Sequence, residues 1–348
     1  MKMVNKANDP ITKCSALLYK GKDFVALSHN TWDMFSSQLR TLKRYELHGG
    51  RFGDRIAVEF SSQPGTIWSY DDWYTNPKYQ MTITETTNNM YNTSLYDLMT
   101  PKSLWTWERS LAVSMIAKTA RDFVELFVQK QSGTYNCQFM AFDEKKMADF
   151  NGDLPPQTFF IVEVMPGVAH IMDMTDLVNK QGFWSSFNIP YFRDTYEASG
   201  YGDKAKTHGD SFIWAKSPRK LIFDREQAKI NSISDFKKLM RYNHFHTDPL
   251  MKGDPGFGIS SRYDLRTDGN AKCFGAIDCK YRIMGSLPHV SGERLPSEYL
   301  PYNGFNFIAG PTAEGDASVF VFSESEVCKD VGFKGGPDRF DYDWSKFL

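Results

Sequence analysis

Cys14-Ser-Ala-Leu-Leu-Tyr19 and, after a Lys-Gly-Lys-Asp turn, Phe24-Val-Ala-Leu-Ser28 form the stretch that decides the predicted fold. Two short apolar runs around a glycine-containing turn predict a β-hairpin. With the turn tip at residues 21–22, Cys14 lies opposite His29. Directly opposed residues on antiparallel strands have Cβ atoms about 5 Å apart. The thiol and imidazole would then be either a nucleophile with its base or a buried structural cysteine beside a hydrogen-bonded histidine.

The composition is that of a globular protein without a charge bias. The chain has 348 residues, 41% hydrophobic and 15% aromatic, enough for one large core or two domains. A net charge of −1 predicts no bulk attraction to nucleic acid or anionic membranes. No apolar run approaches the roughly 20 residues of a membrane span, so no transmembrane segment is expected. Residues 1–10 lack the apolar core of a signal peptide.

The remaining sequence predicts an α+β protein. Apolar spacing between Thr31 and Leu42 indicates a helix or helical turn. Residues 103–131 predict two helices with a break near Lys118–Thr119, and Ile233 to Arg241 predicts another helix. Strands are expected at residues 55–60, 65–68, 80–84, 137–143, 158–164 and 168–173.

A series of ordered motifs resembles the phospholipase B-like family. The matches are collinear from about residue 12 to about residue 285, and this order is more specific than any single motif. The resemblance weakens over the last sixty or so residues. The motifs include Ser28-His-Asn-Thr-Trp32, Thr84-Glu-Thr-Thr87, Ser132-Gly-Thr-Tyr-Asn136, Asn188-Ile-Pro-Tyr-Phe192, Ser217-Pro-Arg219 and Leu239-Met-Arg-Tyr-Asn243.

This resemblance implies an N-terminal nucleophile hydrolase with a four-layer αββα sandwich. Such proteins cut their own chain, here between Lys13 and Cys14, so that residues 1–13 are a leader and 14–348 the hydrolase domain. The freed α-amine, with a pKa of about 8, can take the proton of a thiol whose pKa is about 8.5. Family members carry a long segment before the nucleophile. We therefore expect part of that segment to be missing here and to be supplied by a separate fragment of the same precursor. A shortened paralogue is the alternative.

The resemblance also implies roles for other residues. His29 and Trp32 would orient the nucleophile and wall the pocket. The side-chain N–H of Asn188 would donate to the oxyanion, an interaction typically worth about 100- to 1000-fold in rate. Arg219 would hold the thiolate or a substrate carbonyl. Without the resemblance, the favoured interpretations are that Asn188 caps a turn before Pro190 and that Arg219 is a surface charge. Weaker candidates are Thr86, Thr134 and Asn136.

The expected function is Cys-dependent hydrolysis of phospholipid esters through an acyl-thioester. An amidase acting on linear or N-acyl amides is the alternative enzyme, so the substrate would be a lipid or an N-acyl small molecule. A degenerate, uncleaved lipid- or protein-binding module is the alternative of another class. No cofactor is expected. The pair His244 and His246 near Asp248 could suggest a metal site, but no further ligand is indicated, so no metal is expected either.

The remaining cysteines and one sequon bear on the compartment. Apart from the candidate nucleophile there are four, Cys137, Cys273, Cys279 and Cys328, which allow three pairings. A bridge between Cys273 and Cys279 around a tight loop is one possibility. The resemblance implies a lysosomal or secreted protein, in which Asn92-Thr-Ser94 would be a glycan acceptor.

Overall fold

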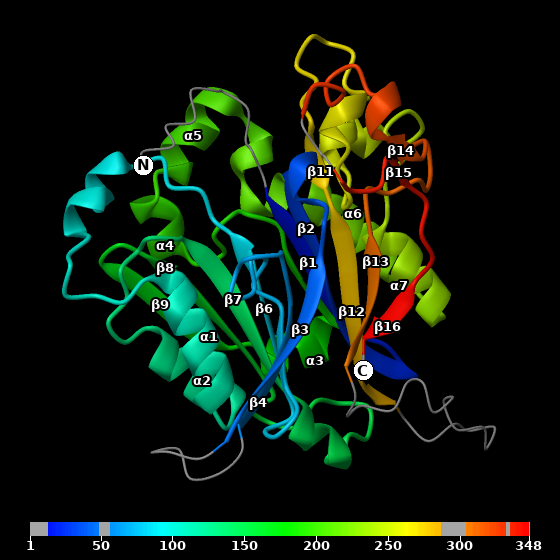
Figure 1. Cartoon of the computed structure of the whole chain (residues 1–348). Coiled ribbons are helices and arrows are strands. Elements are labelled where there is room, and N and C mark those ends of the chain that lie inside the picture. Colours follow the sequence, from blue (N-terminus) through cyan, green and yellow to red (C-terminus); the bar gives the residue numbers. More distant parts are fainter. Residues whose placement is uncertain (1–12, 49–55, 287–303, 332–334, 348) are drawn as a thin grey trace, which may run out of the picture.

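The computed structural model describes residues 13–48, 56–286, 304–331 and 335–347. Within these ranges, two seven-stranded sheets pack face to face, and helices cover their outer faces (Figure 1). The layers follow the order helix, sheet, sheet, helix. The α+β class is therefore confirmed, and the layers are compatible with the predicted sandwich. The expected leader falls almost entirely on residues 1–12, which lie outside the described ranges.

The first sheet is built around the predicted hairpin, with strand order β10-β1-β2-β12-β13-β16 and β11 paired to β2. The hairpin forms, but its register differs from the prediction by two residues. Cys14 pairs with Thr31, and His29 pairs with Ala16. The turn tip lies one residue later than predicted, at residues 22–23, where the Gly21 N–H donates to the Phe24 carbonyl. Side chains alternate between faces with a period of two, so Cys14 and His29 still share a face. The strands are β1 (Cys14–Lys20), β2 (Phe24–Met34), β10 (Phe183–Ser186), β11 (Phe274–Ala276), β12 (Asp278–Ser286), β13 (Phe305–Ala309) and β16 (Ser345–Phe347).

The second sheet is an antiparallel meander in which every strand pairs with its sequence neighbour, in the order β3 to β9. Most of the expected strands are present within a residue or two. Local connections of this kind let strands pair as the chain proceeds. The strands are β3 (Thr41–Leu47), β4 (Ile56–Ser62), β5 (Tyr74–Asn76), β6 (Met81–Thr87), β7 (Cys137–Asp143), β8 (Phe159–Met165) and β9 (Val168–Asp173).

Three apolar cores hold the layers together. The central core lies between the sheets and combines residues such as Leu18 and Leu27 of the first sheet with Phe142 and Ile161 of the second. One outer core packs helices on the second sheet, and the other packs helices on the first. Each sheet is covered on one face by the other sheet and on the opposite face by helices. Side chains on both faces are therefore buried, and strands β1, β4, β6, β7 and β8 are almost continuously buried.

The helices agree with the two clearest helical predictions. The break near Lys118–Thr119 is present, and the Thr119 hydroxyl accepts the backbone N–H of Asp122 to begin the second helix. No helix of the described residues is both long and apolar enough to cross a membrane. The α-helices are α1 (Thr106–Ile116), α2 (Ala120–Phe127), α3 (Thr175–Gln181), α4 (Arg193–Ala198), α5 (Tyr201–His208), α6 (Pro218–Gln227) and α7 (Ile233–Met240).

Two predicted elements are wrong. Residues 31–42 do not form a helix, because β2 continues to Met34 and pairs with β11 through Trp32 and Ala276. Only a 3-10 turn at Phe35–Ser37 follows before β3. Residues 65–68 are not a strand, because Thr66 turns back to the Gln63 carbonyl. In both places tertiary pairing or turn chemistry outweighs the local apolar pattern.

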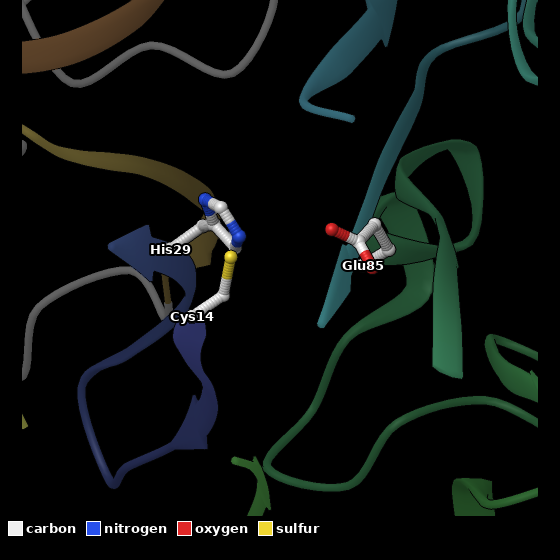
Figure 2. Close-up of side chains that lie close together, drawn as sticks. All are labelled: Cys14, His29 and Glu85. Carbon is white, nitrogen blue, oxygen red and sulfur yellow. The ribbon is translucent and has the colours of Figure 1, made fainter. Parts of the chain in front are cut away.

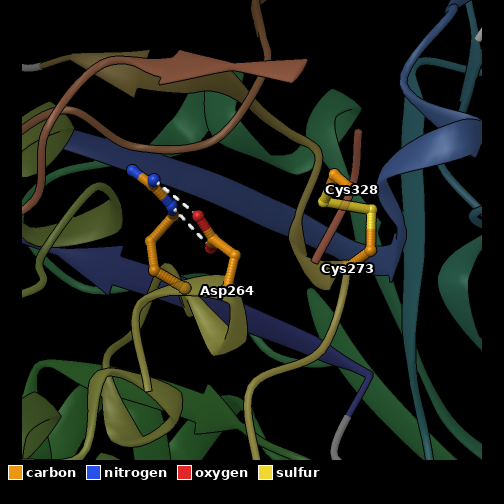
Figure 3. The surroundings of a disulfide bond; sticks show 4 residues. Asp264, Cys273 and Cys328 are labelled. Carbon is orange, nitrogen blue, oxygen red and sulfur yellow. Dashed lines mark hydrogen bonds and ion pairs between the residues drawn. A yellow bond between two sulfur atoms is a disulfide. The ribbon is translucent and has the colours of Figure 1, made fainter. Parts of the chain in front are cut away.

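The disulfide joins Cys273 to Cys328, with a Cα–Cα distance of 5.1 Å (Figure 3). The considered Cys273–Cys279 bridge is therefore wrong. Cys279 belongs to β12 and packs in the core beneath the helices, whereas Cys273 lies in a separate cluster with Cys328. Cys14, Cys137 and Cys279 are free and buried. A short strand pair, β14 (Phe320–Val321) with β15 (Arg339–Phe340), belongs to the same C-terminal region.

Candidate active site

Cys14, His29 and Glu85 meet between the two sheets. The Cys14 sulfur, a His29 ring nitrogen and a Glu85 carboxylate oxygen all lie within 4.8 Å of one another. Cys14 and His29 come from β1 and β2, while Glu85 comes from β6 of the opposite sheet (Figure 2). Their exposed fractions are 3%, 0% and 1%, so the cluster is shielded from solvent. The predicted pairing of thiol and imidazole is thus reached through a shared face rather than direct opposition.

Burial sets the protonation states of this cluster. It raises the pKa of the Cys14 thiol well above its usual value, and Glu85 adds to the rise. It lowers the pKa of His29 well below its usual value, and the Lys280 charge lowers it further. It also raises the pKa of Glu85 well above the ordinary value for a glutamate. A protonated thiol therefore stands beside a neutral imidazole, which is the form that can accept a proton.

A cluster of buried charged side chains lies next to His29. The Arg40 guanidinium lies 2.8 Å from Asp71 and 3.0 Å from Asp278, and all three side chains are at most 1% exposed. Lys280, which pairs with His29 across β2 and β12, donates to both carboxylates. Two positive charges thus balance two negative charges, as burial requires. Burial alone would raise the pKa of Asp71, but Arg40 and Lys280 hold it well below its usual range.

Asn188 contacts the peptide bond between Lys13 and Cys14. Its Oδ1 accepts the backbone N–H of Lys13 at 3.1 Å and that of Cys14 at 3.3 Å. The residue has φ +75°, a left-handed conformation that asparagine tolerates better than most residues. The Tyr201 hydroxyl donates to the Asn188 carbonyl and holds this backbone in place. In this state the Nδ2 group donates to the Thr87 carbonyl at 2.7 Å, so a role as oxyanion donor requires that bond to exchange.

Arg219 is a buried component of the site and not a surface charge. It is 3% exposed, donates to the Cys14 carbonyl at 2.5 Å and to Asn188 Oδ1 at 2.8 Å. Its guanidinium lies over the Trp32 ring at 4.4 Å, a cation–π contact. Burial lowers the pKa of Arg219 to about 10, so the group stays charged at neutral pH. Trp32 therefore positions Arg219, which in turn holds the first residue of β1.

Each of the three weaker candidates makes a hydrogen bond that joins neighbouring elements. The Thr86 hydroxyl bonds to Ser186 at 2.5 Å and links β6 to β10. The Thr134 hydroxyl accepts the backbone N–H of Thr106 at the start of α1, which is a capping role. The Asn136 carbonyl accepts the N–H of the residue after β6, Asn88, at 2.9 Å. The roles of these residues in catalysis stay predictions.

Sequence reasoning missed Glu85, although it lies inside the quoted Thr84-Glu-Thr-Thr87 motif. A carboxyl group in the middle of an otherwise buried strand was the signal that could have identified it. The weak metal reading of Asp248 gains no support, because its carboxylate is engaged by Arg225 at 2.6 and 2.9 Å. A cavity of about 530 Å³ lies elsewhere, beside Lys238 and Tyr242, and none of its lining residues belongs to the Cys14 cluster.

Comparison with known proteins identifies the family. A sequence model described as Phospholipase B matches residues 1–347. Phospholipase B-like protein G of Dictyostelium discoideum is 36% identical over 97% of this chain and 56% of its own length. Protein C of the same organism is 33% identical over 99% and 60%, and Phospholipase B-like 1 of Rattus norvegicus 31% over 95% and 57%. The chain thus spans little more than half the length of these relatives. It belongs to the phospholipase B family.

Proposed function

We propose that this member of the phospholipase B family is a hydrolase that cleaves acyl bonds with the Cys14 thiol. The observation that carries the proposal is the set of contacts around the Lys13–Cys14 peptide. Asn188 accepts both N–H groups of that dipeptide, and Arg219 donates to the Cys14 carbonyl. The thiol beside it has a neutral imidazole as neighbour. These are the groups that cutting the bond and retaining its new amine would require.

In the proposed cut, the thiol gives its proton to His29 while its sulfur attacks the Lys13 carbonyl carbon. The bond from that carbon to the Cys14 nitrogen breaks, and the nitrogen takes up the proton from the imidazolium. Water then hydrolyses the thioester, which releases the Lys13 carboxylate and restores the thiol. The new α-amine has a pKa of about 8. It remains beside Asn188 Oδ1, which accepts its hydrogen bond.

In turnover, the same thiol would attack an ester carbonyl of a phospholipid. The alcohol leaves with a proton, an acyl-thioester forms on Cys14, and water releases the fatty acid. The ester is proposed because the relatives carry the name phospholipase B-like. An amide carbonyl reacts by the same steps, so linear and N-acyl amides are the alternative substrates.

We also propose that the protein works in a lysosomal or secreted compartment. The Cys273–Cys328 disulfide supports this, since such bonds persist mainly in oxidising environments. Asn92 would be the glycan acceptor there, although a glycan must displace the hydrogen bond from its Nδ2 to the Ala198 carbonyl.

The test begins with the cut itself. Full-length wild-type protein and Cys14→Ala are incubated at acidic and neutral pH and followed by denaturing gel and intact mass. Wild type should yield a chain that begins at Cys14, whereas Cys14→Ala should stay whole. Cys279→Ala, which removes another buried free thiol, is the matched control and should be cut like wild type.

The cut protein is then assayed on phospholipid esters and N-acyl amides of matched chain length. Acid release from esters supports the proposal, and release from amides alone selects the amidase. A folded wild-type chain that stays uncut and hydrolyses neither class overturns the proposal in favour of a binding module.

A further inference from the structure

The Cys14–His29–Glu85 cluster has the donor set of a metal site. Sulfur of cysteine, nitrogen of histidine and oxygen of glutamate are the ligand atoms that zinc takes in proteins. Here the three atoms lie within 4.8 Å of one another. Tetrahedral zinc with bonds of about 2.0–2.3 Å holds its ligand atoms about 3.5 Å apart. Closing the cluster onto an ion therefore requires movements of only about 1 Å at the ends of the side chains.

Two of the three side chains also carry buried polar atoms without a hydrogen-bond partner. Among the described residues, no hydrogen-bond partner lies within reach of the two His29 ring nitrogens or of the Glu85 Oε2 atom. Both residues are at most 1% exposed. A buried polar group without a hydrogen-bond partner lowers the stability of the fold. Figure 2 shows a Glu85 oxygen directed across the gap toward the sulfur and the imidazole. A ligand placed in that gap would satisfy groups from both sheets at once.

The surrounding charges suit a divalent cation. Arg40 and Lys280 are balanced by Asp71 and Asp278 through direct ion pairs. This neighbouring cluster therefore adds no net charge. A thiolate and a carboxylate supply two negative charges, which match one divalent ion. Three protein ligands leave the fourth tetrahedral position to water.

We propose that Cys14, His29 and Glu85 bind one zinc-type divalent ion, which holds the thiol in an unreactive form. Binding forms bonds from the ion to sulfur, nitrogen and oxygen, and the thiol and carboxyl protons pass to solvent. The ion competes with every reaction of the thiol. Binding is independent of the proposed hydrolase function, whereas the inhibition of cutting and turnover rests on it.

The test measures binding apart from activity. Full-length protein is dialysed to equilibrium against Zn²⁺, or against Co²⁺ as a coloured substitute, and bound metal is counted per chain. Wild type should bind one ion, and the Co²⁺ form should show the sulfur-to-metal charge-transfer absorption of a thiolate ligand. Cys14→Ala should lose this absorption. Glu85→Gln should weaken binding by at least the roughly 10- to 100-fold that loss of an outer-shell partner costs.

Cys279→Ala is the matched control, since it removes a buried free thiol outside the cluster, and it should bind metal like wild type. Melting curves without metal establish which variants are folded. The proposal is overturned if wild type binds no ion, or if bound Co²⁺ shows no thiolate absorption. It is also overturned if folded Glu85→Gln binds as tightly as wild type. Metal binding without any hydrolytic activity leaves this inference intact and counts only against the proposed function.

Discussion

Replacing Asn188 by glycine or by alanine separates the work of its side chain from the strain of its backbone. Its Oδ1 accepts hydrogen bonds from Lys13, Cys14 and Arg219. Each bond contributes about 1 kcal/mol net. Losing all three therefore removes about 3 kcal/mol of the interaction energy that holds the Lys13–Cys14 peptide in place. With tenfold in rate for each 1.36 kcal/mol or so, cutting at Lys13–Cys14 should slow by about 100-fold in both variants.

The two variants should differ in stability. The backbone at residue 188 has φ +75°. An alanine in this left-handed conformation lowers the free energy of unfolding by about 1–2 kcal/mol, whereas a glycine adopts it without strain. Asn188→Ala should therefore unfold at a lower urea concentration than Asn188→Gly, although both cut equally slowly. Cutting is followed by gel and intact mass over time, and stability by urea unfolding of uncut protein. If Asn188→Gly cuts like wild type, or much faster than Asn188→Ala, the side chain does not position the bond and the reasoning fails.

Three further predictions follow from single contacts. Arg219→Lys should slow cutting by about tenfold or more, because a single ammonium cannot replace a planar fork and its aromatic contact; time courses of chain cutting measure this, and an unchanged rate contradicts it. Burial raises the pKa of Asp248, but hydrogen bonds from Arg225 bring it down to about 2. The stability that ionised Asp248 adds is therefore complete above its ordinary pKa of 3.8 and lost as pH falls through about 2. The gap in urea midpoint between wild type and Asp248→Asn should narrow over that range, and a constant gap refutes the assignment. The bridge between Cys273 and Cys328 closes a loop of 55 residues, so Cys328→Ala should lower the free energy of unfolding by up to about 4 kcal/mol, as measured by urea unfolding under non-reducing conditions; an unchanged midpoint contradicts this.

The sequence predicted the elements whose own pattern matched their final environment. The paired helices at 103–131 carry a capping threonine and apolar faces, and the structure retains them with the break in place. Strand β7 has the predicted bounds. The helix predicted from Thr31 failed because its apolar spacing reflects burial along β2 and its neighbours. Only the pairing with β11, which is remote in sequence, specifies that conformation.

The candidate site was predictable in part for a related reason. The Cys14–His29 pair survived an incorrect register because an error of two residues preserves the face of every side chain. An error of one residue would have separated the two groups. Glu85 reaches them from the other sheet, and Arg40 reaches Asp278 across a much longer stretch of sequence. The local sequence pattern does not indicate which distant segments come into contact. The positions of Glu85 and Arg40 could therefore not be predicted before the fold was known.

The arrangement around Asn188 links the two proposed reactions of this site. In the uncut chain its Oδ1 accepts the amide N–H of Cys14. If the bond is cut, the same nitrogen becomes an amine that still donates hydrogen bonds, so the acceptor needs no rearrangement. Arg219 likewise holds the Cys14 carbonyl, which belongs to the chain on the retained side of the cut. The contacts that align the peptide for cleavage are therefore the ones that would hold the new terminus for turnover. This explains why a buried guanidinium and a left-handed asparagine would be kept at the start of one strand despite their energetic cost.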